Sequence, residues 1–476
     1  MSSDLRPTGT VDAPTLPRLR DLVVGLDVHV PLVDGRHVRY VNLDNAASTP
    51  ALKPVLEAVV RFLEWYSSIH RGTGFKSWLS SSVYDDAHDR VAAFVGADPR
   101  THTVIFGKNA TEAINKLSYR LALKPDDVVL STLMEHHSND LPWRGKATTV
   151  HLPVLGHGQL DVEAIERAFA EHAGRVKLLA VSGASNITGI INPIHDLARL
   201  AHRHGARILV DAAQLAPHRR VRMGSLEDPS HIDFLAFSAH KMYAPFGTGA
   251  LVGPREAFLH GDPETVGGGT VDIVNLEEAV WTHLPDREEA GTPNVVGAIA
   301  LAKAIQVLED IGMDVVAAHE AELTTHLLQG LRTIEGVEIL GPDDPDEAHE
   351  RLGVVAFNLS GLTHGLVAGI LSFEAGIGVR NGCFCAHPYL KWLLGTSDEE
   401  SHRLEEMIRR GDRSELPGAV RVSFGIYNTI EEVDQLLVAL RRVRAGTYRG
   451  RYRLDARTGT YHADGFDVRM NDYFEL

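Results

Sequence analysis

The sequence predicts an α/β protein with a mainly parallel sheet and a second, smaller α+β lobe. From Ala51 to Ile305, short apolar runs alternate with amphipathic stretches, which is the pattern of βαβ units. Beyond Pro293 a long helical pattern begins, and a strand-like run follows at Gly353–Leu359. A chain of 476 residues is also too long for one compact core, so two or three lobes are expected.

Five short apolar runs bounded by turn signals are expected to be strands of the large sheet. They are Thr103–Phe106, Asp127–Ser131, Lys177–Ser182, Arg207–Val210 and Ile232–Ala236. Helical patterns occupy Ala110–Leu123, Asp161–Ala173, Pro193–His204, Val296–Ile311, Val315–Thr333 and Ile430–Val443. The alternation of the two kinds of element favours a parallel arrangement of the strands.

These patterns divide the chain into five parts. Residues 1–20, which are rich in Ser, Thr and Pro, are expected to form a flexible arm. Residues 21–50 are expected to join the smaller lobe, and 51–295 to form the large, cofactor-binding domain. Residues 296–445 then form the small domain, and 446–476 a C-terminal extension to which no role is assigned.

Composition and charge exclude several classes of function. The formal net charge of −16 argues against a general nucleic-acid binder, which needs a clustered basic surface. No run approaches the ~18 apolar residues of a membrane helix, and the first residues lack the apolar core of a signal peptide. We therefore expect a cytoplasmic protein without membrane or nucleic-acid partners.

An aspartate and a lysine follow two neighbouring apolar runs. Asp211 directly follows the run Ile208–Val210, and Lys241 follows the run Ile232–Phe237 by a few residues. Ligands of open parallel sheets bind at the carboxyl ends of the strands, so the two side chains are expected to meet there. Such a pair suits pyridoxal phosphate, because the lysine forms a Schiff base while the carboxylate keeps the pyridine nitrogen protonated. Taken singly, Asp211 could be a turn cap and Lys241 a solvated loop lysine.

The stretch after Thr103–Phe106 suits a phosphate group. It reads Asn-Ala-Thr-Glu from Asn109 and opens a helix, whose free N–H groups bind anions. Thr111 of this helix is a candidate ligand, although a helix cap would explain it equally well. Ser238 and His240 are further candidate donors from the lysine loop.

Cys383 and Cys385 are the two cysteines of the chain, and their spacing makes a mutual disulfide geometrically poor. Three interpretations remain open: a buried apolar thiol, a Cys-x-Cys-x-His metal site with His387, or a reactive thiol. The metal site lacks a further cysteine ligand, and we assign no residue to a metal. A reactive thiol is the interpretation that we favour.

Six motifs in order resemble the class V family of pyridoxal-phosphate enzymes, with the closest likeness to the SufS-type cysteine desulfurases and selenocysteine lyases. The resemblance covers about Leu43 to Leu440 and implies the type I fold of these enzymes. The motifs are Val41–Ser48, Glu135–His137, Ser185–Gly189, Asp211–Gln214, Ser238–Lys241 and Ala290–Asn294.

The resemblance also implies roles for single residues. Lys241, His136 and Cys385 would be catalytic, and Arg421, Asn186 and Arg380 would lie at the substrate, with Arg421 binding its carboxylate. His136 would stack on the cofactor ring, Asn186 and Gln214 would lie near its phenolic oxygen, and Asp211 would pair with its nitrogen. Thr111, Ser238 and His240 would hold the phosphate, and Thr292 would reach the cofactor of a neighbouring subunit, which implies a homodimer.

In the run Arg380–Pro388, Cys385 matches the position of the desulfurase nucleophile. The resemblance therefore implies that its thiolate takes sulfur from cysteine, which leaves alanine and an enzyme persulfide for an acceptor protein. Cys383-Phe384 replaces the usual His-His pair and is closer to the Gly-Cys-Phe-Cys motif of molybdenum-cofactor sulfurases. The charged stretch Ser397–Arg413 is longer than in compact bacterial desulfurases, and it could be a lid, a docking element or a solvated helix.

The leading hypothesis is thus a pyridoxal-phosphate-dependent cysteine desulfurase-like enzyme. Two alternatives remain. One is a class V aminotransferase or C–S lyase acting on another amino acid, in which Cys385 has no role. The other is a docking module without turnover, against which the retained Lys241 and Asp211 argue.

Overall fold

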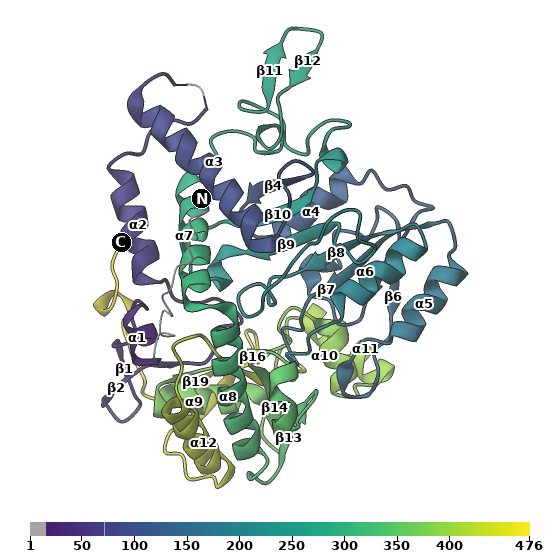
Figure 1. Cartoon of the computed structure of the whole chain (residues 1–476). Helices are drawn as coiled ribbons and strands as arrows, with labels where there is room; N and C mark the ends of the chain where they lie inside the picture. The colour runs from purple at the N-terminus through teal and green to yellow at the C-terminus, as the bar shows by residue number, and fades with distance from the viewer. Residues whose placement is uncertain (1–15, 71) are drawn as a thin grey trace, which may run out of the picture.

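The computed structural model describes residues 16–70 and 72–476. The predicted flexible arm therefore falls largely outside the described residues, and helix α1 (Leu16–Asp21) covers its end. Figure 1 shows a broad sheet with its helices and, below it, a smaller group of strands and helices. None of the described helices is long and apolar enough to cross a membrane.

The large sheet has seven strands in the order β4-β10-β9-β8-β7-β5-β6. Strand β10 is antiparallel to both of its neighbours, and the other six strands share one direction. The strands are β4 (His102–Gly107), β5 (Val128–Thr132), β6 (Thr148–Leu152), β7 (Val176–Ser182), β8 (Arg207–Asp211), β9 (Phe234–Ser238) and β10 (Gly249–Pro254). The five predicted strands are confirmed, with β9 beginning two residues later than expected, whereas β6 and β10 were not predicted.

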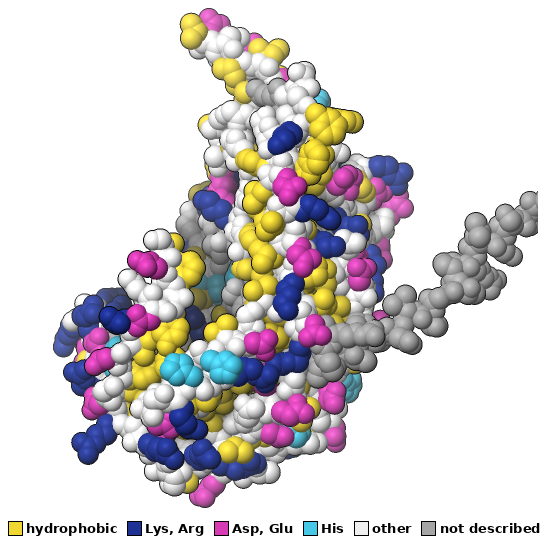
Figure 2. All heavy atoms as spheres, turned by 90° about the vertical axis from the view of Figure 1, so that its left-hand side faces the viewer, with side chains coloured by type: hydrophobic (Ala, Val, Ile, Leu, Met, Phe, Trp, Pro, Cys, Tyr) yellow, Lys and Arg dark blue, Asp and Glu magenta, His cyan; other side chains and the backbone are white. Residues whose placement is uncertain are grey.

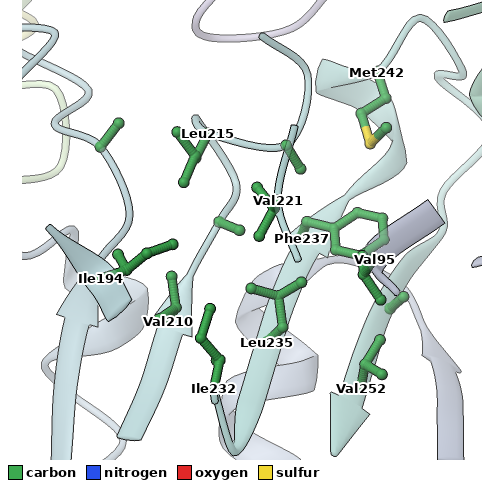
Figure 3. Packing of buried hydrophobic residues seen from close by; sticks show 14 of the residues in the cluster. Val95, Ile194, Val210, Leu215, Val221, Ile232, Leu235, Phe237, Met242 and Val252 are labelled. Atoms are coloured by element: carbon green, nitrogen blue, oxygen red, sulfur yellow. The ribbon is translucent and has the colours of Figure 1, made fainter. Parts of the chain in front are cut away.

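Alternate residues of the strands pack into two different apolar clusters, one on each face of the sheet. On one face, Leu178, Leu209 and Ala236 pack with apolar residues of α4 (Ala110–Arg120). The other face carries the larger cluster, part of which is seen in Figure 3. Its helices are α2 (Lys53–Leu63), α3 (Phe75–Val95), α5 (Val162–Glu171), α6 (Ile194–Arg203) and α7 (Val295–Ile311).

The smaller group is built on a four-stranded antiparallel sheet in the order β13-β14-β17-β16. Its strands are β13 (Val337–Leu340), β14 (Val354–Leu359), β16 (Arg380–Gly382) and β17 (Ala419–Ser423). Helices α8 (Met313–Leu331), α9 (His364–Ala375) and α12 (Ile430–Arg444) supply a second large apolar cluster. The chain enters this group at Gly312, whose positive φ of 92° turns it between α7 and α8.

Short strands near the N-terminus add to the second group. Strand β3 (Val41–Asn42) pairs in parallel with β15 (Ile377–Gly378), and β1 (His29–Pro31) pairs with β2 (His37–Arg39). The N-terminal segment therefore pairs with an element more than 300 positions away. This pairing brings Asp44 next to Arg421, a residue of the cavity described below.

Three further elements project from or cover this frame. The hairpin β11 (Val271–Val274) and β12 (Ala279–Trp281) projects at the top of Figure 1. The charged stretch 397–413 contains helix α11 (Asp398–Arg409), which follows α10 (His387–Leu393). The C-terminal extension, to which the sequence assigned no element, forms the hairpin β18 (Tyr452–Asp455) and β19 (Thr460–Ala463) against α9.

Candidate active site

A cavity of about 230 Å³ opens at the carboxyl ends of the parallel strands. It lies where β7, β8 and β9 end, in agreement with the rule for ligand sites of open α/β sheets. The predicted site residues that line it are Thr111, His136, Asn186, Asp211, Gln214, Ser238, His240, Lys241, Arg380, Cys385 and Arg421. Thr292 alone among the predicted residues is not part of its wall.

Lys241 and Asp211 face the cavity from neighbouring strand ends. Desolvation lowers the pKa of Lys241 to about 8, although the negative charge of Asp211 opposes this shift. Desolvation likewise raises the pKa of the buried Asp211 carboxyl, and an N–H bond from Ala213 at 3.0 Å opposes that change. Among the described residues, the amine of Lys241 has no hydrogen-bond partner, so it remains available to a ligand.

His136 is a neutral ring beside this pair. Desolvation, together with the positive charge of Lys241, lowers its pKa to about 3. The backbone N–H of Ser138 donates to its Nδ1 at 3.1 Å, and a backbone N–H cannot accept. The proton of the neutral ring is therefore on Nε2.

The first turn of α4 forms one end of the cavity. Asn109 caps the helix by accepting the N–H of Glu112, and the hydroxyl of Ser238 accepts the N–H of Ala110 at 2.8 Å. Thr111 and Ser138 share a hydroxyl hydrogen bond of 2.7 Å. This end presents hydroxyl groups and a positive helix terminus, which are the donors that a phosphate needs.

The loop that carries Lys241 is anchored by the N-terminal segment. The carbonyl of His240 accepts hydrogen bonds from the hydroxyls of Ser48 and Thr49 and from the N–H of Thr49. The side-chain amide of Gln214 donates to the carbonyl of Ala46 at 2.8 Å, so this buried side chain also holds the segment. Positioning of the lysine thus depends on a stretch nearly two hundred residues earlier.

Arg421 is almost completely buried, and two of its nitrogens are bonded within the protein. Its Nη1 donates to the carbonyl of Asn186, and its Nη2 to a carboxylate oxygen of Asp44, each at 3.0 Å. The Nε atom is buried without a partner among the described residues. Arg380 is exposed, and its Nη1 lies 4.0 Å from the other carboxylate oxygen of Asp44. Two of the five guanidinium N–H groups of Arg421 are thus bonded to described residues, and three remain for a carboxylate ligand.

The cysteine loop has an unusual backbone. Phe384 and Cys385 have φ values of 52° and 56°, in the left-handed region that non-glycine residues rarely adopt. The side chain of Asn186 donates to the carbonyl of Phe384 at 2.7 Å, and the N–H of His137 donates to that of Cys385 at 2.8 Å. The guanidinium of Arg421 lies 4.9 Å from the centroid of the Phe384 ring. Both strained residues are thus held in place from the large sheet.

The two thiols have different surroundings. Cys385 is exposed and lines the cavity, whereas Cys383 is half-buried and donates to the carbonyl of Pro417 at 2.9 Å. Burial raises the pKa of Cys383 to about 11, which keeps it a protonated thiol at neutral pH. Of the two cysteines, only Cys385 has access to the cavity.

Asp44, His137, Ser138 and Phe384 contribute to the site, although no role was predicted for them. Asp44 and His137 lie within motifs that carry the family resemblance, which was the available signal. Asn186 does line the cavity as expected, but its amide nitrogen is bonded to the Phe384 carbonyl. Its side-chain oxygen and its second amide N–H are then left for a ligand.

Thr292 lies on the outside of its own subunit. It lines a surface hollow with Ser68, His70 and Gly268, below the β11–β12 hairpin. Its exposed position and its absence from the Lys241 cavity mean that this threonine cannot serve the cavity of its own chain as the structure stands.

Comparison with known proteins agrees with this geometry. The family model described as aminotransferase class-V matches residues 41–436. A probable cysteine desulfurase of Halalkalibacterium halodurans is 36% identical over 85% of this chain and 93% of its own length. A cysteine desulfurase of Haloferax volcanii is 35% identical over 88% of this chain and 93% of its own length.

Solved structures give the same result and confirm the predicted fold class. The apo structure of a cysteine desulfurase from Thermococcus onnurineus has a TM-score of 0.74 and 33% identity, covering 86% of this chain and 95% of that one. A cysteine desulfurase from Escherichia coli has a TM-score of 0.75 and 27% identity, covering 92% and 100%. The chain therefore belongs to the aminotransferase class-V family.

Proposed function

We propose that the chain is a pyridoxal-phosphate-dependent cysteine desulfurase that converts L-cysteine to L-alanine and collects the sulfur on Cys385. One observation carries the proposal: an exposed thiol opens into the same cavity as Lys241, Asp211 and Arg421. The kinship with proteins named as cysteine desulfurases supports the same conclusion.

The residues of the cavity fit the cofactor. The Lys241 amine has no hydrogen-bond partner among the described side chains and backbone groups, and its lowered pKa favours the neutral form that reacts with an aldehyde. Asp211 is buried and would be satisfied by a protonated ring nitrogen. The hydroxyls of Thr111, Ser138 and Ser238 gather at the first turn of α4, where a phosphate would be held.

When bound, pyridoxal phosphate supplies an aldehyde that joins the substrate amine and a ring that withdraws electrons from Cα. Lys241 would be the group that takes the Cα proton and returns a proton to carbon, because a pKa of about 8 lets its amine both accept and release a proton near neutral pH. His136 lines the same cavity and would contact the cofactor as a neutral ring without adding a positive charge, since its pKa is about 3.

Cys385 performs the sulfur transfer. Its thiolate attacks the sulfur of the substrate, so that an S–S bond forms while the Cβ–S bond breaks and Cβ keeps the electron pair. Protonation of that carbon yields alanine. Cys385 lies close enough to Lys241 and Arg421 to interact electrostatically with both cationic side chains.

The product persulfide would be accessible to a second protein. Cys385 is exposed in the described chain, so that its terminal sulfur can be reached by the thiol of an acceptor. Cys383 cannot take over this role, because its thiol donates a hydrogen bond to the Pro417 carbonyl and stays protonated.

Replacement of the two cysteines tests the proposal. We expect Cys385→Ala to abolish sulfide release from L-cysteine while keeping the yellow cofactor band, and Cys383→Ala to retain most activity. Lys241→Ala should lose both activity and the covalently bound cofactor. Sulfide and alanine are measured in the presence of a dithiol, and mass spectrometry without the dithiol should show one added sulfur on the wild-type chain.

Two results would contradict this proposal. Equal sulfide release by wild type and Cys385→Ala would remove Cys385 from the reaction. Release of keto acid or ammonia from other amino acids, without sulfide from cysteine, would favour an aminotransferase or a C–S lyase instead.

Cofactor capture should depend on pH. The neutral amine of Lys241 is the reactive form, so the rate at which cofactor-stripped protein takes up pyridoxal phosphate should rise with pH through about 8. The negative charge of Asp211 raises the pKa of Lys241, and Asp211→Asn removes this charge. The midpoint of the rate-versus-pH profile should therefore move to lower pH in this variant. Stopped-flow absorbance measures the rate, with Lys241→Ala as the blank, and an unchanged midpoint in Asp211→Asn would refute the coupling.

Arg421 should bind the substrate carboxylate. A lysine cannot reproduce the two bonds to Asp44 and Asn186 together with a third donor at Nε. We therefore expect Arg421→Lys to raise KM for cysteine by roughly 10- to 100-fold, the value of one or two charge-assisted hydrogen bonds. Arg199→Lys, on the exposed surface of α6 and outside the cavity, serves as the control, and equal KM values for the two variants would assign the carboxylate elsewhere.

We propose further that two chains form a homodimer. A patch of exposed apolar side chains covers α2, the start of α3 and the hairpin tip, and includes Val60, Phe75, Trp78 and Leu276. Figure 2 shows apolar side chains gathered along the face that carries α2 and on the projecting hairpin. Exposed apolar side chains that gather on one face often mark a contact with another protein chain. Thr292, on the surface near this hairpin, would then reach the cavity of the second chain.

Light scattering tests the homodimer. We expect wild type to have twice the mass of one chain, and Trp78→Asp to dissociate in the micromolar range because it places a charge in the apolar patch. Val162→Asp, at an exposed position on α5, should leave the mass unchanged. A wild-type chain that runs as a monomer at all concentrations would exclude the dimer and the role of Thr292.

A further inference from the structure

Side chains of the kinds that bind metal ions form a cluster at the amino-terminal ends of the parallel strands, opposite the Lys241 cavity. His202 is in the last turn of α6, and His231 and Asp233 immediately precede β9. One ligand atom from each of the three lies within 4.8 Å of the other two. None of the three residues belongs to the wall of the Lys241 cavity.

The two imidazoles point at the two oxygens of one carboxylate. Nε2 of His202 lies 2.8 Å from Oδ2 of Asp233, and Nε2 of His231 lies 3.5 Å from Oδ1. The two rings are stacked, with centroids 4.2 Å apart and planes inclined by 24°. The three side chains are mostly but not fully buried, so a small ion could reach them.

The other ring nitrogens determine the tautomers. Nδ1 of His202 lies 2.8 Å from the carbonyl of Pro229, and Nδ1 of His231 lies 2.6 Å from the carbonyl of Asp228. A carbonyl only accepts, so both Nδ1 atoms carry hydrogen. In the neutral rings both Nε2 lone pairs therefore face the Asp233 carboxylate, and three electron-pair donors converge on one point.

Such convergence needs a positive charge between the donors. Protonated rings would supply it, because the hydrogen bonds to Asp233 raise the pKa of both histidines, but two imidazolium ions would be stacked face to face at 4.2 Å with only one carboxylate to offset them. A single metal ion satisfies all three donors while both rings stay neutral. Histidines that bind metals commonly donate their second ring N–H to a backbone carbonyl, as both histidines do here.

We propose that His202, His231 and Asp233 form a binding site for a divalent transition-metal ion, with zinc as the ion that the donor set fits best. Two imidazole nitrogens and one carboxylate oxygen are typical zinc ligands, and water can complete the tetrahedron. His102 lies nearby, because His231 and Asp233 both act on it electrostatically, and its Nε2 is buried without a partner in the described part of the chain. It is not among the side chains whose ligand atoms lie within 4.8 Å of one another, so water is the fourth ligand that the arrangement favours.

The proposed site would stabilise the fold rather than take part in the desulfurase reaction. Asp233 precedes β9 and Ser238 ends it, so the two sites are separated by the length of a five-residue strand, about 15 Å. A bound ion would join the end of α6 to the loop before β9. Asp233 already accepts the N–H of Ile208 at the start of β8, which would orient it as a ligand.

The test is zinc binding by the holoenzyme after chelator treatment, with Cys385 alkylated so that the thiol cannot bind the metal. Zinc per chain is measured by equilibrium dialysis and elemental analysis, and thermal unfolding is followed with and without zinc chloride. The variants are His202→Gln and His231→Gln. His195→Gln is the matched control, because Nδ1 of His195 on the same helix is bonded to Ser230 of the same loop, but His195 has no contact with Asp233.

We expect one zinc ion per wild-type chain, a higher Tm with zinc, and the same behaviour in His195→Gln. His202→Gln and His231→Gln should bind zinc at least about tenfold more weakly and lose the Tm increase. The proposal is overturned if wild type binds no zinc, or if the two ligand variants bind as much zinc as His195→Gln.

Discussion

The interaction on which the site depends is that of the Lys241 amine with the Asp211 carboxylate at adjacent strand ends. Parallel pairing places Asp211 beside Ala236 of β9, five residues before Lys241. Desolvation disfavours both charges, since it lowers the pKa of the lysine to about 8 and raises that of the aspartate. Replacing the pair by apolar residues would cost the fold little. The pair is therefore explained by chemistry that needs a reactive amine and a carboxylate, rather than by stability.

A second constraint brings the thiol to this pair. Cys385 belongs to the smaller group of elements, and its backbone is left-handed, as is that of Phe384. A left-handed backbone costs a non-glycine residue roughly 1–3 kcal/mol of folding free energy, so it persists only where surrounding contacts fix the conformation. Asn186 and His137 supply those contacts through the two carbonyls, and Arg421 packs on the Phe384 ring. The contacts that hold the strained loop thus come from residues in and beside the cavity, so the conformation of the loop depends on that of the cavity.

Local sequence patterns were sufficient for much of this arrangement. The strands β5, β7, β8 and β9 are continuous apolar runs, as buried parallel strands must be, and the polar residues that follow them mark the edge of the sheet. Strand β10 was missed because glycine and proline at its ends indicate a turn. Strand β6 was missed because it is largely polar and only partly buried.

The remaining features depend on contacts between distant parts of the chain. The bond from Arg421 to Asp44 spans 377 positions and that from Asn186 to Phe384 spans 198, so no local pattern indicates either one. The family resemblance placed these residues in the site, but it gave no partner to Asp44. In the same way, His202 and His231 belong to separate segments, and only the packing of α6 beside β8 and the loop before β9 brings them to one carboxylate.

The two cysteines show most clearly what local sequence cannot decide. They are separated by one residue, and the same composition surrounds both. Their difference arises from the loop after α11, whose Pro417 carbonyl accepts the Cys383 thiol, and from the left-handed turn that carries Cys385 to the surface of the cavity. Burial and a hydrogen bond to Pro417 keep the first thiol protonated, whereas the second is exposed and opens into the cavity. The family resemblance selects Cys385 by its position, and the tertiary structure supplies a physical reason, because of the two thiols only this one reaches the cavity.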